Sequence, residues 1–148
     1  MRKTLVSILA VLLGVVVCAA ARDLGRDEQM GGHTLARHVG RTDNQLRERL
    51  DREPQIAAAS TYDDRPTAER VVGEALSRLS SRVDEWRARQ GRRPNLTLRF
   101  RGDRRQIGRT LERGRHASTA CTDAVVVLHW DERRNDYYVL TSYPEARR

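Results

Sequence analysis

The stretch "AVVVLHWDERRNDYYVLTSYP", residues 124–144, decides the fold class of this chain. It consists of two runs rich in β-branched and aromatic residues, separated by the polar residues 131–136. Such runs favour strands, and a short polar connection between two of them is typical of an antiparallel hairpin. We therefore expect an antiparallel sheet in the C-terminal part of the chain.

Two segments precede this hairpin. In "NLTLRF", residues 95–100, apolar and polar residues alternate, which predicts a strand with one buried face. The segment "RRQIGRTLERG", residues 104–114, carries Ile107 and Leu111 one helical turn apart, and we predict a short amphipathic helix there.

The middle of the chain predicts a long helix. "DDRP", residues 63–66, is a turn that places Pro66 at the first helical position, and Gly91 and Pro94 end the segment. Between them apolar residues recur at spacings of three and four, as on the buried face of a helix. These residues are Val72, Ala75, Leu76, Leu79, Val83 and Trp86. Before this helix, "QIAAASTY" at residues 55–62 predicts a short strand.

The stretch "GGHTLARHVGRTDNQLRERL", residues 31–50, predicts two short helices. Gly40 ends the first, and Thr42 with Gln45 forms a capping-box pattern at the start of the second. Helices thus come first in the chain and strands mostly follow. This order predicts an α+β fold, with N-terminal helices packed on an antiparallel β-sheet, in one domain at residues 31–148.

The first residues have the three parts of a secretory signal peptide. Arg2 and Lys3 are followed by an apolar run and then by small residues. We predict a signal peptide at residues 1–21, a flexible linker at residues 22–30, and a secreted or periplasmic protein without stable membrane association after cleavage. Two alternatives are lipidation of Cys18 and an uncleaved anchor, although the apolar run is shorter than the roughly 20 residues that span a membrane.

Cleavage would leave Cys121 as the one cysteine, so no intramolecular disulfide could form. It would also lower the net charge from +8 to +6, because Arg2 and Lys3 leave and no acid does. All remaining strong cations are arginines, which suit bidentate binding of phosphate and favour an anionic partner. The arginines of residues 99–115 could follow an RNA backbone or form an ordinary solvated surface.

The sequence lacks the motifs that are typical of several enzyme classes. No phosphate-binding loop, dinucleotide-binding fingerprint or GxSxG motif occurs. We expect no metal and no cofactor, because His33 and His38 are not at the i, i+4 spacing of two ligands on one helical face, and no closely spaced cysteine pair exists.

Some residue types could still carry chemistry. Histidine titrates near neutral pH and can act as a general base or acid, and His33 and His38 lie within one short segment. Thr141 and Tyr143 are two positions apart on a predicted strand, so both hydroxyls share one face and could donate to a phosphate oxygen. Each observation also has a structural explanation, since single histidines often only pack and Thr and Tyr are common in strands.

Taken in order, these pieces resemble a known family. "GGHTLARHVG", "LRERL", "AAASTY", a long helix with a tryptophan, a valine-rich strand and a terminal "TSYP" look like the RNase A-like toxin domain at the C-termini of CdiA contact-dependent inhibition proteins. The resemblance covers residues 31–144. It implies an RNase A-like fold, a ribonuclease toxin that acts on RNA, and a cognate immunity protein as a possible partner.

The resemblance also implies an active site. The family's histidine, arginine, threonine and tyrosine correspond to His38, Arg49, Thr141 and Tyr143, and His33 matches the motif as a further site residue. It implies cleavage without a metal, by attack of the RNA 2′-OH, to give a 2′,3′-cyclic phosphate. With its predicted signal peptide the chain would depart from the family, whose domain normally ends a very large exported protein.

Two other functions are compatible with the sequence. A non-catalytic module that binds nucleic acid or another polyanion would need the arginines but would tolerate loss of His38 and Tyr143. A periplasmic structural or inhibitory protein with the same fold would neither cleave RNA nor bind it in a salt-sensitive way.

Overall fold

The computed structural model describes residues 19–147, so Cys18 and most of the predicted signal peptide lie outside the described residues. Within this range the chain forms two three-stranded antiparallel sheets. The first contains β1 (Ala58–Tyr62), β3 (Gly108–Glu112) and β4 (Thr119–Cys121), in that order, and the second contains β2 (Leu96–Phe100), β5 (Asp123–Asp131) and β6 (Asp136–Glu145). The helices are α1 (Leu24–Gln29), α2 (Thr34–His38), α3 (Asp43–Arg52), α4 (Arg65–Arg78) and α5 (Ser80–Arg87).

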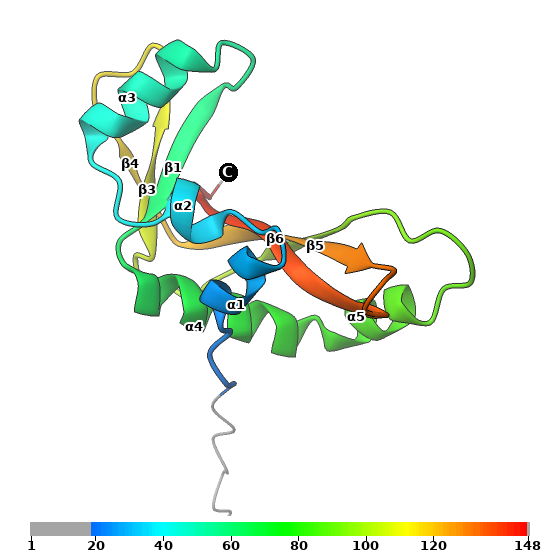
Figure 1. The fold of residues 1–148 in the computed structure, drawn as a ribbon. Helices are drawn as coiled ribbons and strands as arrows, with labels where there is room; N and C mark the ends of the chain where they lie inside the picture. Colours follow the sequence, from blue (N-terminus) through cyan, green and yellow to red (C-terminus); the bar gives the residue numbers. More distant parts are fainter. Residues whose placement is uncertain (1–18, 148) are drawn as a thin grey trace, which may run out of the picture.

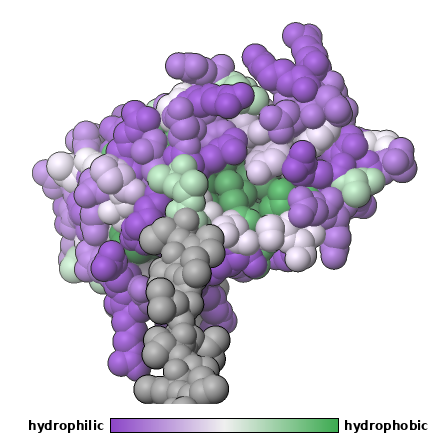
Figure 2. Space-filling model, turned by 90° about the horizontal axis from the view of Figure 1, so that it is seen from below, coloured by the Kyte–Doolittle hydropathy of each residue, from purple (hydrophilic) through white to green (hydrophobic). Residues whose placement is uncertain are grey.

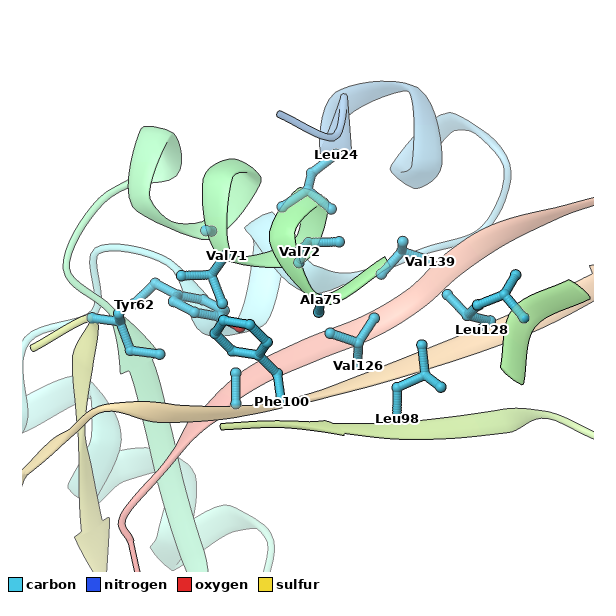
Figure 3. Packing of buried hydrophobic residues seen from close by; sticks show 14 of the residues in the cluster. Leu24, Tyr62, Val71, Val72, Ala75, Leu98, Phe100, Val126, Leu128 and Val139 are labelled. Atoms are coloured by element: carbon cyan, nitrogen blue, oxygen red, sulfur yellow. The ribbon is translucent and has the colours of Figure 1, made fainter. Parts of the chain in front are cut away.

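The helices cover the two sheets on different sides. Figure 1 shows α3 beside β1, β3 and β4, the helices α4 and α5 along the second sheet, and α2 between the two sheets. The main core lies between α4 and the second sheet, where Val71, Val72, Val126 and Leu128 are fully buried (Figure 3). Among the described residues, 19–147, no helix is long and apolar enough to cross a membrane.

Polar side chains cover most of the face that Figure 2 presents, and hydrophobic residues gather near its centre. This distribution agrees with the composition, in which 32% of the residues are charged. Apart from this patch, the buried apolar residues form the core of the protein.

The predicted α+β fold is confirmed. The hairpin of residues 124–144 forms β5 and β6, and β2 buries Leu98 and Phe100 while Thr97 stays exposed. Cys121 is a buried free thiol, so the described residues hold no disulfide, and burial raises the pKa of this thiol to about 12.

The predicted capping box is also present. The Gln45 amide donates to Thr42 Oγ1 at 3.3 Å, and the Thr42 amide donates to Gln45 Oε1 at 2.9 Å. The helix that begins here, α3, buries Leu46 and Leu50 against Leu111, which forms a second, smaller core under the first sheet. Local capping and this small core therefore fix α3 on the first sheet.

The long helix predicted between Pro66 and Gly91 is interrupted. It divides at Leu79, whose φ of −110° and ψ of 22° leave the helical region, into α4 and α5. Two serines follow Leu79, and serine pairs are a common site of helix kinks. Val83 and Trp86 still reach the core beyond the break.

The helix predicted at residues 104–114 is wrong, because Gly108–Glu112 within this segment form β3 and none of its residues is helical. Each residue of β3 pairs with one of β1, from Gly108 opposite Tyr62 to Glu112 opposite Ala58. A side chain at Gly108 would overlap the carbonyl oxygen of Thr61, so the close approach requires glycine. Pairing with a distant strand thus outweighs the local helical pattern.

The flexible linker predicted at residues 22–30 is also wrong. This segment forms α1, whose Leu24 is fully buried and whose Asp27 is 1% exposed. Asp27 accepts hydrogen bonds from the Arg22 guanidinium at 2.6 and 2.9 Å and from the Val139 amide at 3.1 Å. No periodic pattern predicts α1, because a single buried apolar residue, Leu24, and a buried ion pair stabilise it.

We predict that Asp27→Ala destabilises the protein by about 3 kcal/mol, because it removes the partner of Arg22 and leaves the buried Val139 amide without an acceptor. Urea denaturation measures this loss. Gln29→Ala, an exposed position on the same helix, is the control and should change the free energy of unfolding by less than about 0.5 kcal/mol. Equal effects of the two substitutions would contradict this account.

Candidate active site

The five residues predicted for the site come together in one cavity of about 310 Å³. The cavity lies where α2 contacts β1 of the first sheet and β6 of the second. Figure 1 shows α2 between the two sheets. Its floor includes Ile56, Ala58 and Ser60, which precede or belong to β1. The predicted residues around it are His33, His38, Arg49, Thr141 and Tyr143. His116 and His129, the other histidines of the chain, do not line it.

The helix α2 positions the two histidines. His33 is its N-cap residue and His38 its last residue. Gly40 follows with a φ of +64°, a conformation that suits glycine, and its amide donates to the Tyr62 carbonyl at 3.0 Å. The end of α2 is thereby attached to β1, which directs His38 into the cavity.

The environment of His38 sets its protonation state. Its Nδ1 lies 3.1 Å from the Ser60 carbonyl oxygen, and because a carbonyl only accepts, Nδ1 carries the proton and Nε2 keeps a free lone pair. The side chain is 6% exposed, and this burial lowers the pKa of His38 to about 4, with the nearby charge of Arg49 acting in the same direction. His38 is therefore a neutral imidazole at pH 7.

Arg49 supplies the positive charge of the cavity. It lies on α3, its Nη1 is 3.5 Å from His38 Nδ1, and its Nε donates to Glu53 at 3.2 Å. Glu53 is one helical turn further along the chain and holds the guanidinium in this orientation. Glu53 was not among the predicted site residues, although its i, i+4 spacing from Arg49 is visible in the sequence. The contact between the Ser60 carbonyl and His38 could not be predicted, because every residue has a backbone carbonyl and the sequence does not show which one meets the histidine.

A β-bulge places the two hydroxyl residues. Val127 of β5 pairs with Thr141, but Leu128 pairs with Val139, so Leu140 is an extra residue in β6. Before the bulge Val139 packs in the core, and after it Ser142 occupies the buried side. Thr141 and Tyr143 consequently turn away from the core and line the cavity.

The N-terminal segment holds this bulge. The carbonyl oxygen of Leu140 accepts a hydrogen bond from the His33 amide at 2.9 Å. The Val139 amide donates to Asp27 instead of to a neighbouring strand. His33 and Thr141 are thus brought together through the backbone of a single extra residue.

Both hydroxyl groups are available as donors. Thr141 Oγ1 is buried and has no hydrogen-bond partner among the described residues. The ring of Tyr143 is 5.5 Å from the ring of His38, and burial raises the pKa of its phenol, which stays protonated near neutral pH. Burial also lowers the pKa of His33, with the charge of Arg37 as the second cause.

The cavity therefore combines a neutral base, a guanidinium and two hydroxyl donors. This set can bind an anion and stabilise negative charge that develops on it, while His38 Nε2 accepts a proton. Among residues 19–147 no three His, Cys, Asp or Glu side chains form a group that could hold a metal ion.

Comparisons with known proteins identify a family and a similar fold. Residues 32–144 match the family described as the bacterial CdiA-CT RNAse A domain. Among solved structures, the chain is similar to a crystal structure of a CdiA-CT/CdiI complex from Y. kristensenii 33638, with 27% sequence identity and a TM-score of 0.68. That similarity covers 77% of this chain and 99% of the other chain. No curated protein matches.

We predict that His38 makes the protein less stable in acid. Between pH 6.5 and about 4 the unfolded chain binds a proton at this residue that the folded protein does not, so lowering the pH favours unfolding. The lost stability amounts to about 3 kcal/mol. Denaturation at several pH values should show a shallower pH dependence for His38→Gln than for the wild type. His116→Gln, at an exposed position, should behave as the wild type, and identical curves for all three proteins would contradict the prediction.

We also predict that Thr141→Val stabilises the protein by about 1 kcal/mol, because it removes a buried hydroxyl without a partner among the described residues. Thr61→Val is the matched control. Its buried hydroxyl accepts from the Arg41 amide and donates to the Tyr62 carbonyl, so its removal should destabilise the protein by about 1 to 3 kcal/mol. Thermal denaturation measures both changes, and a loss of stability in Thr141→Val would show that its hydroxyl is paired.

Proposed function

Because the chain belongs to the bacterial CdiA-CT RNase A family, we propose that it is a ribonuclease toxin that cleaves RNA through attack of the 2′-OH on the adjacent phosphate. The products are a 2′,3′-cyclic phosphate and a free 5′-OH. The observation that carries this proposal is the meeting of His38, Arg49, Thr141 and Tyr143, from three separate parts of the chain, in one cavity.

His38 is the general base of the proposed reaction. With Nδ1 bound to the Ser60 carbonyl, its Nε2 is free to accept the proton of the 2′-OH. A pKa of about 4 makes the free imidazole a weak base. A bound phosphodiester opposes the charge of Arg49 and so raises the pKa of His38 toward the range useful for catalysis.

The other residues stabilise the charge that develops on phosphorus. Arg49 offers several N–H donors to the non-bridging oxygens, and the hydroxyls of Thr141 and Tyr143 can donate to the same oxygens. The Thr141 hydroxyl, without a partner among the described residues, supports this role, because an anion in the cavity would supply an acceptor for it.

The leaving 5′-oxygen needs a proton. His33 lines the same cavity and can supply it in its protonated form, and Tyr143 keeps its phenolic proton at neutral pH. His33 is the proposed donor, because the same phosphate that raises the pKa of His38 also raises the pKa of His33 and favours its protonated state.

The proposal extends to metal independence, location and partner. Base, acid and charge stabilisation are all assigned to side chains, so the reaction needs no metal ion.

The proposed route is export behind the signal peptide, with action in the cytoplasm of a target cell. The matched CdiA-CT structure is a complex with CdiI, which supports an immunity protein as the partner of this chain. A polyanion-binding module remains the alternative function, and the basic net charge favours it.

We predict that the purified protein cleaves total RNA in the presence of EDTA and that His38→Ala lowers the rate by about 10²- to 10⁴-fold. Gel electrophoresis follows cleavage, and ³¹P NMR identifies a cyclic phosphate product. His116→Ala is the control, because it removes an exposed imidazole outside the cavity and should cleave as the wild type does. Salt-sensitive RNA binding without cleavage by the folded wild type would favour the binding module instead.

A further inference from the structure

A second cavity adjoins the site. It lies between α2 and α3, has a volume of about 340 Å³, and shares Arg49 with the first cavity. The other charged residues around it are Arg37, Arg41, Arg52, Glu48 and Glu53. Arg49 is therefore in contact with both cavities, and a ligand bound at Arg49 lies next to each of them.

The second cavity carries excess positive charge. Four arginines line it against two glutamates, and one of these, Glu53, is bound to Arg49 at 3.2 Å. Arg41 donates to the Ala36 carbonyl oxygen. Arg37 and Arg52 are exposed, and neither side chain has an ion pair or hydrogen bond with another described residue. Their guanidinium groups are thus available to an anionic ligand.

Another basic cavity on the molecule differs in this respect. Arg99 and Arg101 line a cavity together with Glu145 and Asp123, and Arg99 is paired with Glu145 at 2.7 Å. Arg147 is paired with Asp123 at 2.6 Å. The two arginines of this cavity are balanced by two carboxylates, so its lining carries no excess positive charge and attracts an anion less than the cavity between α2 and α3 does.

We propose that the cavity between α2 and α3 is a second phosphate-binding subsite, in which Arg37 and Arg52 bind the backbone phosphate next to the one that is cleaved. This inference rests on the proposed ribonuclease function. Successive phosphates of an RNA strand are one nucleotide apart, so a strand whose cleaved phosphate lies at Arg49 must place a neighbouring phosphate close by. Arginine suits this ligand because its planar fork binds two phosphate oxygens at once.

The test uses substrates with one cleavable linkage. Each is a DNA oligonucleotide with a single ribonucleotide, and in two further versions the linkage on the 5′ or the 3′ side of the cleaved one is a neutral methylphosphonate. The values of kcat/KM are measured for the wild type, for the double variant Arg37→Ala/Arg52→Ala, and for the control Arg89→Ala/Arg92→Ala. The control removes two exposed arginines beyond the end of α5, outside both cavities.

One methylphosphonate should lower kcat/KM of the wild type about tenfold, and the other should have a smaller effect. In Arg37→Ala/Arg52→Ala the all-phosphate substrate should lose a similar factor, and the sensitive methylphosphonate should cause little further loss, because both changes remove the same interaction. The salt dependence of kcat/KM should also become shallower, by about 0.7 for each phosphate that no longer binds an arginine. The control should retain the wild-type sensitivity to both methylphosphonates.

Two results would overturn the subsite. One is equal sensitivity of the wild type and Arg37→Ala/Arg52→Ala to each methylphosphonate, and the other is the same loss in the control variant. If the wild type cleaves none of these substrates and no RNA, the ribonuclease function itself fails. Cleavage by the wild type without coupling between these arginines and a neighbouring phosphate removes only the subsite.

Discussion

The candidate site depends on one irregularity, the extra residue Leu140 in β6. Without it the strand would continue its alternation, and Thr141 would turn toward the core on the same side as Val139. The bulge leaves an amide and a carbonyl without partners in the sheet, and the N-terminal segment supplies them through Asp27 and the backbone of His33. The helix α1, which contributes no residue to the cavity, is thus part of what positions it.

Elements that depend on nearby residues could be predicted from the sequence, whereas elements that depend on distant segments could not. The capping box at Thr42, the alternation in β2 and the hairpin of β5 and β6 depend on neighbours in the chain, so their patterns are visible and the predictions were confirmed. The strand β3 and the helix α1 depend on contacts with distant segments, and local patterns misrepresented both.

The same distinction applies to the site. The shared face of Thr141 and Tyr143 follows from their spacing and was predicted, since both lie beyond the bulge. The bulge turns this face toward the cavity and away from the core, and no sequence pattern predicts it. The five residues were collected by their resemblance to a family motif, whereas the roles of Ser60 and Glu53 in orienting them require the folded chain.

The cavity is also a place where the fold gives up stability. A buried Thr141 hydroxyl without a partner among the described residues favours the unfolded chain, where water would solvate it. Below pH 6.5 the buried imidazole of His38, which stays neutral when folded, favours the unfolded chain as well. Arg49 adds to this, because its charge lies beside His38 and opposes protonation. An anion between these groups would accept from the hydroxyl, offset the guanidinium and allow the imidazole to gain a proton. The groups that destabilise the free protein would therefore interact favourably with a bound phosphodiester. They would interact more strongly with a phosphorane, because it carries more negative charge.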